Sequence, residues 1–200
     1  MKKLQALIIV VLAAVVLIPL SVQADSSYSS GSYGTCQFNA CGISLTTSGA
    51  VTANVVPGSG PNCSVSSDSV SVLTDSSTGY TLTLNDNDTA NQLTGSSATI
   101  APTTGTNTSP SLLTANKWGY RVDSVSGFGA GPAATVTNGA VPSYSFAGVP
   151  LSSSAADTIA TSPTAANPAV TTTVWYGVCA NFSIPSGTYT DTVVYTAVVN

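Results

Sequence analysis

The chain has 200 residues, with only four Lys and Arg, eight acidic residues that are all Asp, and no His. So few cations exclude the usual electrostatic capture of nucleic acid, which needs several Lys or Arg side chains to displace counterions from phosphates. Without His and Glu, the residue types on which most general acid/base, zinc and iron centres depend are also missing.

The first 24 residues have the pattern of a Sec signal peptide. Lys2 and Lys3 supply a positive start, an apolar run of 15 residues extends from Ala6 to Leu20, and Val22-Gln23-Ala24 is a small-x-small cleavage site. That run is shorter than the ~20 residues that a membrane-spanning helix needs. We therefore expect cleavage after Ala24 and a secreted or extracellular cell-surface protein, which meets the membrane only through the signal segment before cleavage.

Residues 25–42 are rich in Ser, Tyr and Gly and are expected to form an N-terminal arm, followed by a single domain over residues 43–200. Of the 176 residues after the predicted cleavage site, 57 are Ser or Thr. Val, Ile, Leu and aromatic residues recur between them, which distinguishes the chain from a disordered tract. A chain of this length buries enough surface to form a core unaided, and we expect no cofactor.

Two-residue alternation predicts strands. In Tyr80-Thr81-Leu82-Thr83-Leu84 the large apolar residues share one face. From Lys117 to Asp123 the apolar residues alternate with polar or small ones, so Lys117 and Arg121 are expected on an outward face. Further strands are predicted over residues 49–56, 69–73, 143–149, 170–182 and 187–199.

Turn-forming residues separate these runs, and no long window has the 3.6-residue period of a helix. Seven to ten strands without intervening helices indicate an all-β, antiparallel β-sandwich. Residues 103–113 and 151–168 are predicted as long loops, the second with a short helix at residues 153–160.

The four cysteines of an exported chain, Cys36, Cys41, Cys63 and Cys179, predict two disulfides. We favour Cys36 with Cys41, a short loop, and Cys63 with Cys179, which would tie an early strand to a late one and bridge the sandwich. The pairing of Cys36 with Cys63 stays open. Catalytic or metal-binding use of these thiols has no His partner.

The densest acidic cluster is Asn85-Asp86-Asn87-Asp88. Asp86 and Asp88 are weak candidates for Ca²⁺ ligands, since the spacing of a calcium loop, with its central Gly and distal Glu, is absent. A turn between two strands explains the same residues and is preferred. An Asp-based hydrolase using this pair is a further alternative, although the sequence shows no group that would separate the two carboxyl pKa values.

The run Pro185-Ser186-Gly187-Thr188-Tyr189 precedes an alternating C-terminal strand. A tight turn followed by Gly-x-Tyr resembles the tyrosine corner of immunoglobulin-like sandwiches, and this resemblance implies that the phenol of Tyr189 bonds back to the backbone. Continued through Thr190-Asp191-Thr192-Val193-Val194-Tyr195-Thr196-Ala197, the run also resembles the last strand of bacterial pilins and spore-coat-like secreted proteins.

Thr78-Gly79-Tyr80-Thr81-Leu82 and Trp118-Gly119-Tyr120-Arg121-Val122 extend this resemblance to secreted bacterial surface proteins over about residues 51–199. It implies an immunoglobulin-like or pilin-like β-sandwich. Together with the signal, it leads us to expect a non-enzymatic structural protein such as a fibre or surface-layer subunit, whose partners are other surface proteins or further copies of itself.

An alternative function is a carbohydrate-binding or adhesion module. Tyr28, Tyr33, Trp175 and Tyr176 are the aromatic residues that would carry it, because flat apolar rings with a polar edge stack on sugars. In that case the partner is a glycan.

Overall fold

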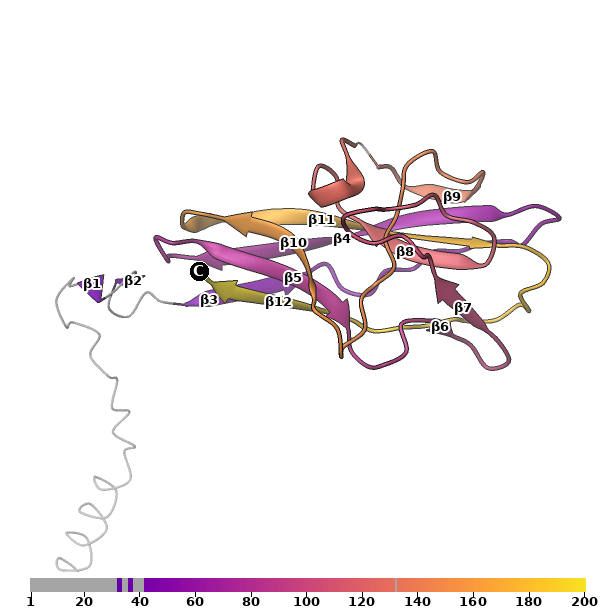
Figure 1. The fold of residues 1–200 in the computed structure, drawn as a ribbon, viewed down its shortest axis with the longest axis horizontal. Coiled ribbons are helices and arrows are strands. Elements are labelled where there is room, and N and C mark those ends of the chain that lie inside the picture. Colours follow the sequence, from indigo (N-terminus) through magenta and orange to yellow (C-terminus); the bar gives the residue numbers. More distant parts are fainter. Residues whose placement is uncertain (1–31, 34–35, 38–41, 132) are drawn as a thin grey trace, which may run out of the picture. The chain divides into compact units, whose positions relative to one another are not determined.

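The computed structural model of the protein describes residues 32–33, 36–37, 42–131 and 133–200 (Figure 1). The predicted signal segment, the cleavage site after Ala24 and most of the predicted arm lie outside the described residues. Of the two units into which the chain divides, Met1–Gly31 and Ser32–Asn200, the second contains everything described below. No helix in this part of the chain is long and apolar enough to cross a membrane.

The described part consists of strands, connecting loops and one short 3₁₀ helix. The elements in chain order are β1 (Ser32–Tyr33), β2 (Cys36–Gln37), β3 (Ile43–Thr47), β4 (Asn62–Thr74), β5 (Tyr80–Asp86), β6 (Leu93–Thr94), β7 (Thr99–Pro102), β8 (Lys117–Arg121), η1 (Ser126–Phe128), β9 (Val136–Gly139), β10 (Asp157–Ser162), β11 (Ala166–Ala180) and β12 (Val193–Val199).

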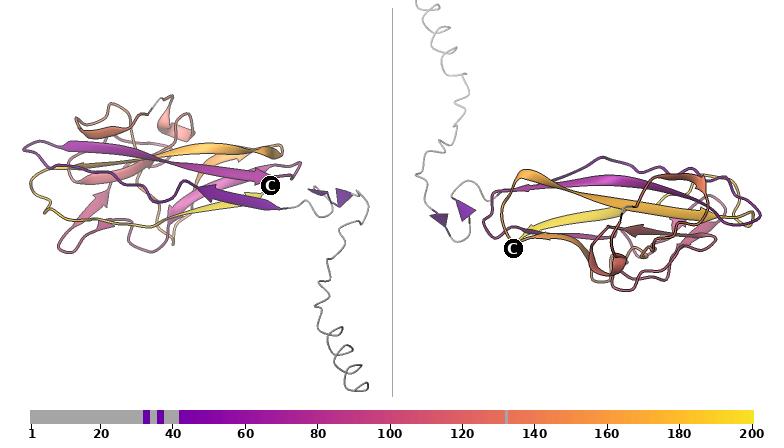
Figure 2. Two further views of the ribbon diagram at one scale, coloured as in Figure 1. Left: turned by 180° about the vertical axis from the view of Figure 1, so that it is seen from behind. Right: turned by 90° about the horizontal axis from the view of Figure 1, so that it is seen from above.

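Two sheets form the body, and Figures 1 and 2 show them lying one over the other. The larger sheet has the order β3-β4-β11-β8-β7-β6, with β9 also paired to β4, and the smaller has the order β10-β5-β12. β1 and β2 pair with each other. The all-β prediction is therefore confirmed, but the sheets are mixed and not purely antiparallel, because β7 and β8 run parallel.

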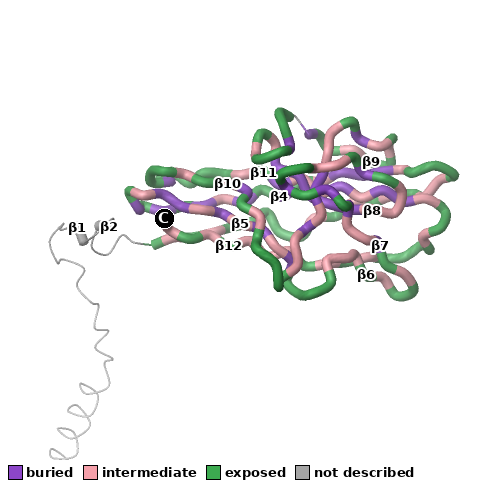
Figure 3. Tube along the Cα trace, viewed as in Figure 1, coloured by how far each residue is buried: buried purple, intermediate pink, exposed green. Residues whose placement is uncertain are grey.

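The main core lies between the two sheets, where the buried positions of Figure 3 concentrate. β5 follows the predicted alternation: Tyr80, Leu82 and Leu84 are fully buried and the residues between them are partly exposed. Opposite them, the larger sheet contributes Val70 and Val72 from β4 and further buried side chains from β8 and β11. Burial of this apolar face is the main term that stabilises the sandwich.

A second cluster lies on the other face of the larger sheet. Because side chains alternate along β4, Cys63 and Val65 point away from the face that carries Val70 and Val72. Leu113 and Phe146, both from connecting segments, cover them. At this end the outer face of the larger sheet is therefore buried by loops.

Two predicted segments have a different structure. Residues 49–56 belong to no strand, and residues 143–149 make only isolated bridges. Within the predicted loop 151–168, in place of a short helix, β10 pairs with β5 and buries Ile159. The single large apolar residue in that run gives too little periodicity for a strand to be recognised. Residues 103–113 form a loop, as predicted.

Candidate functional site

A groove with a volume of about 590 Å³ opens along one side of the sandwich. Residues 49–53 form one wall, and residues 189–193, which lead into β12, form the other. Tyr176 and Val178 of β11, together with Trp118 and Leu93, complete the lining. We call this cavity the side groove.

Aromatic rings in the side groove are held by polar contacts. The indole Nε1 of Trp118, which is 4% exposed, donates to the carbonyl of Asn91 at 3.1 Å. The phenol of Tyr189 donates to the carbonyl of Pro185 at 2.8 Å, and its ring packs on the α-carbon of Gly95, where a Cβ would come within 2.6 Å. Both rings are thus fixed in place in the groove lining.

One end of the groove contains a buried polar network. Tyr176 and Tyr195 share a hydrogen bond of 2.6 Å between their hydroxyl groups. Asp68, 3% exposed, accepts hydrogen bonds from the amide and the hydroxyl of Ser48 at 2.9 and 2.6 Å. Burial raises the pKa of both phenols, so they remain protonated and available as donors or acceptors at neutral pH.

Three carboxyl groups interact near the end of β5 and the start of β12. They belong to Asp86, Asp88 and Asp191, and we call them the acidic cluster. Burial raises the pKa of Asp191 to about 7, and the nearby carboxylates of Asp86 and Asp88 add to the increase. Asp191 also lines the side groove. The sequence could not connect it with Asp86 because 104 residues separate them.

The two candidate calcium ligands have different environments. Asp86 is 1% exposed and its Oδ1 accepts the amide N–H of Asp88 at 2.8 Å. Asp88 is exposed, and its own Oδ1 accepts the amide of Ala90 at 2.7 Å. These contacts are the local side-chain to backbone bonds of an Asx-rich turn. The partner that the structure brings to Asp86 is Asp191, which sequence reasoning had not selected.

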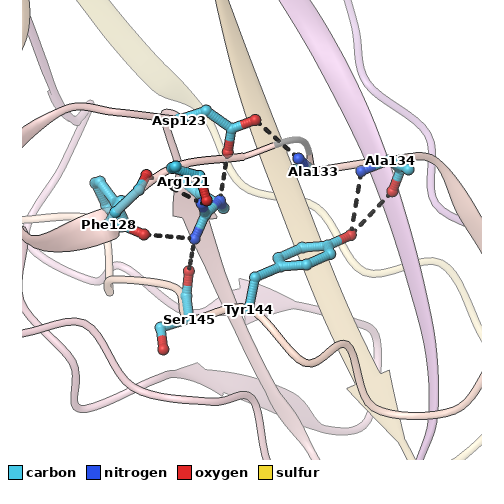
Figure 4. A network of polar contacts seen from close by, with 9 residues as sticks. Arg121, Asp123, Phe128, Ala133, Ala134, Tyr144 and Ser145 are labelled. Carbon is cyan, nitrogen blue, oxygen red and sulfur yellow. Dashed lines mark hydrogen bonds and ion pairs between the residues drawn. The ribbon is translucent and has the colours of Figure 1, made fainter.

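The prediction that both cations after the signal segment face outward is wrong for Arg121. Its side chain lies on the face opposite Trp118 and Tyr120, as the alternation predicted, but it is only 1% exposed. The loops that cover this face surround the guanidinium and bind it through backbone carbonyls (Figure 4). Lys117 is half-buried, and among the described residues the only ion pair is Arg121 with Asp123.

Cys63 and Cys179 form the disulfide that the sequence favoured. They are directly opposed in neighbouring strands, β4 and β11. The bond therefore joins two strands of one sheet. The expectation that it bridges the two sheets of the sandwich is wrong. The side chain of Cys36 and all of Cys41 lie outside the described residues.

The aromatic candidates for sugar binding do not form one row. Trp175 and Tyr176 are consecutive in β11 and therefore point to opposite faces. Tyr176 lines the side groove, whereas Trp175 packs against the cluster around Cys63 and Cys179. Tyr28 and the side chain of Tyr33 lie outside the described residues. Tyr189 and Tyr195 are the aromatic groove residues that the sequence had not connected with binding.

Comparison with known proteins adds no relative: no protein-family model, no curated protein and no solved structure matches the chain.

Proposed function

We propose that the protein is a non-enzymatic structural protein of the cell surface that assembles with further copies of itself by strand addition. The observation that carries this proposal is the segment 49–56, which we call the open edge. It carries no charged residue, and burial alternates along it, with Val51, Ala53 and Val55 half-buried and the residues between them exposed.

The open edge has the alternating burial of a strand but is not paired with another strand. None of its backbone groups makes a backbone-to-backbone hydrogen bond with another described residue. Contacts to β4 come from side chains, because the hydroxyls of Ser66 and Ser64 donate to the carbonyls of Thr52 and Asn54 at 2.9 and 2.5 Å. The N–H groups from Ala50 to Val55 donate to no described group.

An uncharged edge with unpaired backbone groups is a template for pairing with another strand. Proteins that remain monomeric usually protect such edges with Lys, Pro or a covering loop. The same segment of a second copy offers matching donors and acceptors, so we take that copy as the partner.

The test is the assembly state of the mature chain, residues 25–200, measured by sedimentation velocity and electron microscopy across a range of concentrations. We expect reversible association that Asn54→Lys weakens at least tenfold, because the added charge lies on the open edge and no side-chain contact of Asn54 is lost. The matched control is Ser153→Lys in an exposed loop, which should associate like the parent. A parent chain that stays monomeric at millimolar concentration would contradict the proposal.

Export is part of the same proposal and has its own test. The support is the signal pattern that ends at Ala24. N-terminal sequencing of the protein recovered from the medium or the cell surface should begin at Asp25. Recovery only from the cytoplasm, with Met1 retained, would contradict export.

A second candidate function is carbohydrate binding in the side groove. The observation that favours it is the combination of Tyr176, Tyr189 and Tyr195 with the carboxyl groups of Asp68 and Asp191 along one cavity. Aromatic rings stack on sugars, and carboxylates accept bonds from sugar hydroxyls. Affinity electrophoresis in polysaccharide gels should show retention that Tyr189→Ala reduces and Tyr144→Ala, outside the groove, leaves unchanged. Equal mobility with and without polysaccharide would exclude this candidate.

A further inference from the structure

The acidic cluster is defined by the register of two strands. Asp86 pairs with Val193 where β5 meets β12. The pairing continues past the strand ends, since the amide of Asn87 donates to the carbonyl of Thr192 at 3.0 Å. Extending this antiparallel register places Asp88 opposite Asp191, with Asp86 two residues away on the same face.

Two oxygen atoms of this cluster are buried and have no partner. Asp86 Oδ2 and Asp191 Oδ2 are both inaccessible to solvent and accept no hydrogen bond from a donor group among the described residues. The two carboxyl groups lie within hydrogen-bonding reach of each other. Their other oxygens are used, by the amide of Asp88 and by the amide of Thr192, each at 2.8 Å. A buried carboxylate oxygen without a partner is costly, and two that interact with each other are more so.

Among the described residues, no cation forms an ion pair with this cluster to offset the cost. Only Lys117 and Arg121 carry cations among the described residues, and the guanidinium is already bound to Asp123. A proton shared between Asp86 and Asp191 would neutralise one of the three carboxylates. A divalent cation would neutralise two of the three carboxylates and would coordinate both unpaired oxygen atoms.

We propose that the acidic cluster binds one Ca²⁺ ion, with Asp86 Oδ2 and Asp191 Oδ2 as its carboxylate ligands. This inference goes beyond the proposed assembly function and does not depend on it. The donors are all hard oxygen atoms, without His or thiolate, and such a set favours Ca²⁺ over zinc or copper.

Among the described residues no three His, Cys, Asp or Glu side chains are arranged to hold a metal by themselves. Carbonyl oxygens and water would have to supply the remaining ligands, which Ca²⁺ accepts readily because its coordination is flexible. Mg²⁺ demands a stricter octahedral arrangement and gives up its water reluctantly, so it should bind this cluster more weakly.

The ion would connect two segments that are far apart in the sequence. Asp86 ends β5, while Asp191 belongs to the wall of the side groove. Bound Ca²⁺ would fix that wall to β5 and replace repulsion between carboxylates with shared coordination.

The experiment uses the mature chain, residues 25–200, stripped of metal with a chelator and then titrated with CaCl₂ at pH 7.5. We expect isothermal titration calorimetry to show one ion per chain, and the melting temperature to rise by about 5 °C at saturation. MgCl₂ at the same ionic strength should raise it much less.

Asp191→Asn tests the ligand assignment, because its amide oxygen can still accept the N–H of Thr192 while the charge is removed. In this variant calcium should raise the melting temperature by less than about 1 °C. The matched control, Asp75→Asn, removes an exposed carboxylate that accepts a bond from Asn167, and it should keep the full calcium response.

Three results would overturn the proposal. They are no calorimetric binding by the parent at 10 mM CaCl₂, an equal response to magnesium, and a calcium response that survives in Asp191→Asn. In the first case a shared proton alone neutralises the pair, and Asp191→Asn should then raise the melting temperature without any added metal.

Discussion

Arg121 and Asp123 form a partly buried ion pair whose Nε to Oδ1 distance is 2.5 Å, and this pair organises the loop that follows β8. The other oxygen of Asp123 accepts the amide of Ala133 at 2.8 Å. The two terminal nitrogens of Arg121 donate to carbonyls at 2.9 to 3.4 Å, those of Phe128, Ser145, Gly129 and Ala130. The guanidinium also lies 5.2 Å from the ring centroid of Tyr144 (Figure 4). One side chain thus binds both the loop over residues 128–130 and the segment that contains Ser145.

Replacing Arg121 should be strongly destabilising. Arg121→Met removes the donors to four carbonyls and leaves Asp123 without its counterion in a partly buried site, so we expect a loss of about 3–5 kcal/mol in the free energy of unfolding. Arg121→Lys should recover only part of this, because an ammonium group cannot reproduce the planar set of donors. Urea denaturation followed by fluorescence measures both.

Lys117 provides the matched control for Arg121. It lies on the same strand and is half-buried, but it forms no ion pair with a described residue. Lys117→Met should therefore change the free energy of unfolding by no more than about 0.5 kcal/mol. Similar losses for the two substitutions would show that the carbonyl contacts of Arg121 contribute little.

The disulfide between Cys63 and Cys179 should contribute a large share of the stability. It closes a loop with a sequence separation of 116 residues, for which the chain-entropy account gives about 4–5 kcal/mol. The variant with both Cys63→Ala and Cys179→Ala should lose about that amount in urea denaturation. Peptide mapping without reduction should recover the fragment that joins Cys63 to Cys179, and its absence would contradict the pairing.

The remaining two cysteines give a control with a separate prediction. If Cys36 pairs with Cys41, as the sequence indicates, the closed loop is short and its loss should cost less than the loss of the long one. The variant with Cys36→Ser and Cys41→Ser should therefore unfold at a urea concentration close to that of the parent.

Gly119 allows two chain segments to approach closely. It pairs with Gly177 across β8 and β11, and the backbone of Ala147 lies beside the same strand. Tyr120 and Ala147 exchange two backbone hydrogen bonds at 2.8 and 2.9 Å there. A Cβ on Gly119 would collide with the carbonyl oxygen of Ala147, which is backbone and cannot rotate away.

Gly119→Ala should therefore cost about 1–3 kcal/mol in the free energy of unfolding. The control is Gly60→Ala, where an added Cβ meets no atom within 4 Å. Differential scanning calorimetry of both variants compares them. An unchanged melting temperature for Gly119→Ala would mean that the segment around Ala147 is free to move away from the sheet.

Local sequence patterns predicted much of the sandwich. Tyr80, Leu82 and Leu84 alternate with Thr, and their burial on one face of β5 follows directly from the two-residue period. The same reasoning placed Arg121 opposite Trp118 and Tyr120, which is correct. Its burial could not be predicted, because it depends on loops from elsewhere in the chain that cover the outer face.

The candidate sites depended on long-range pairing that the sequence does not encode locally. Asp191 meets Asp86 only through the register of β12 on β5, and the side groove forms only when residues 49–53 lie across from residues 189–193. In the open edge, burial alternates as the sequence predicts, but the predicted strand does not form. The absence of a neighbouring strand depends on the sheet order, which no local pattern determines.

The hydrogen bond between Tyr120 and Asp157 should make stability depend on pH. The fully buried phenol donates to Asp157 Oδ2 at 2.6 Å, and Asn107 lies in the same pocket. Burial raises the pKa of Asp157 above its ordinary value of 3.8, although the bonds from Tyr120 and Asn107 partly oppose the increase.

Because the folded state holds this proton more tightly than the unfolded state, the contribution of Asp157 is fully present below about pH 3.8 and is lost as pH rises through its raised pKa. Asp157→Asn keeps an acceptor for Tyr120 but cannot ionise. Its free energy of unfolding relative to the parent should therefore increase as the pH rises above about 3.8. Urea denaturation at several pH values measures the difference, and a constant offset would contradict the raised pKa.

Tyr120→Phe tests the donor side of the same bond. Removing the hydroxyl leaves Asp157 without its strongest donor, so the loss of stability should be about 1–3 kcal/mol at pH 7. The loss should be smaller near pH 3.5, where Asp157 is protonated and carries no charge to be stabilised. Equal losses at both pH values would mean that the phenol contributes through packing in the core and not through its bond to the carboxylate.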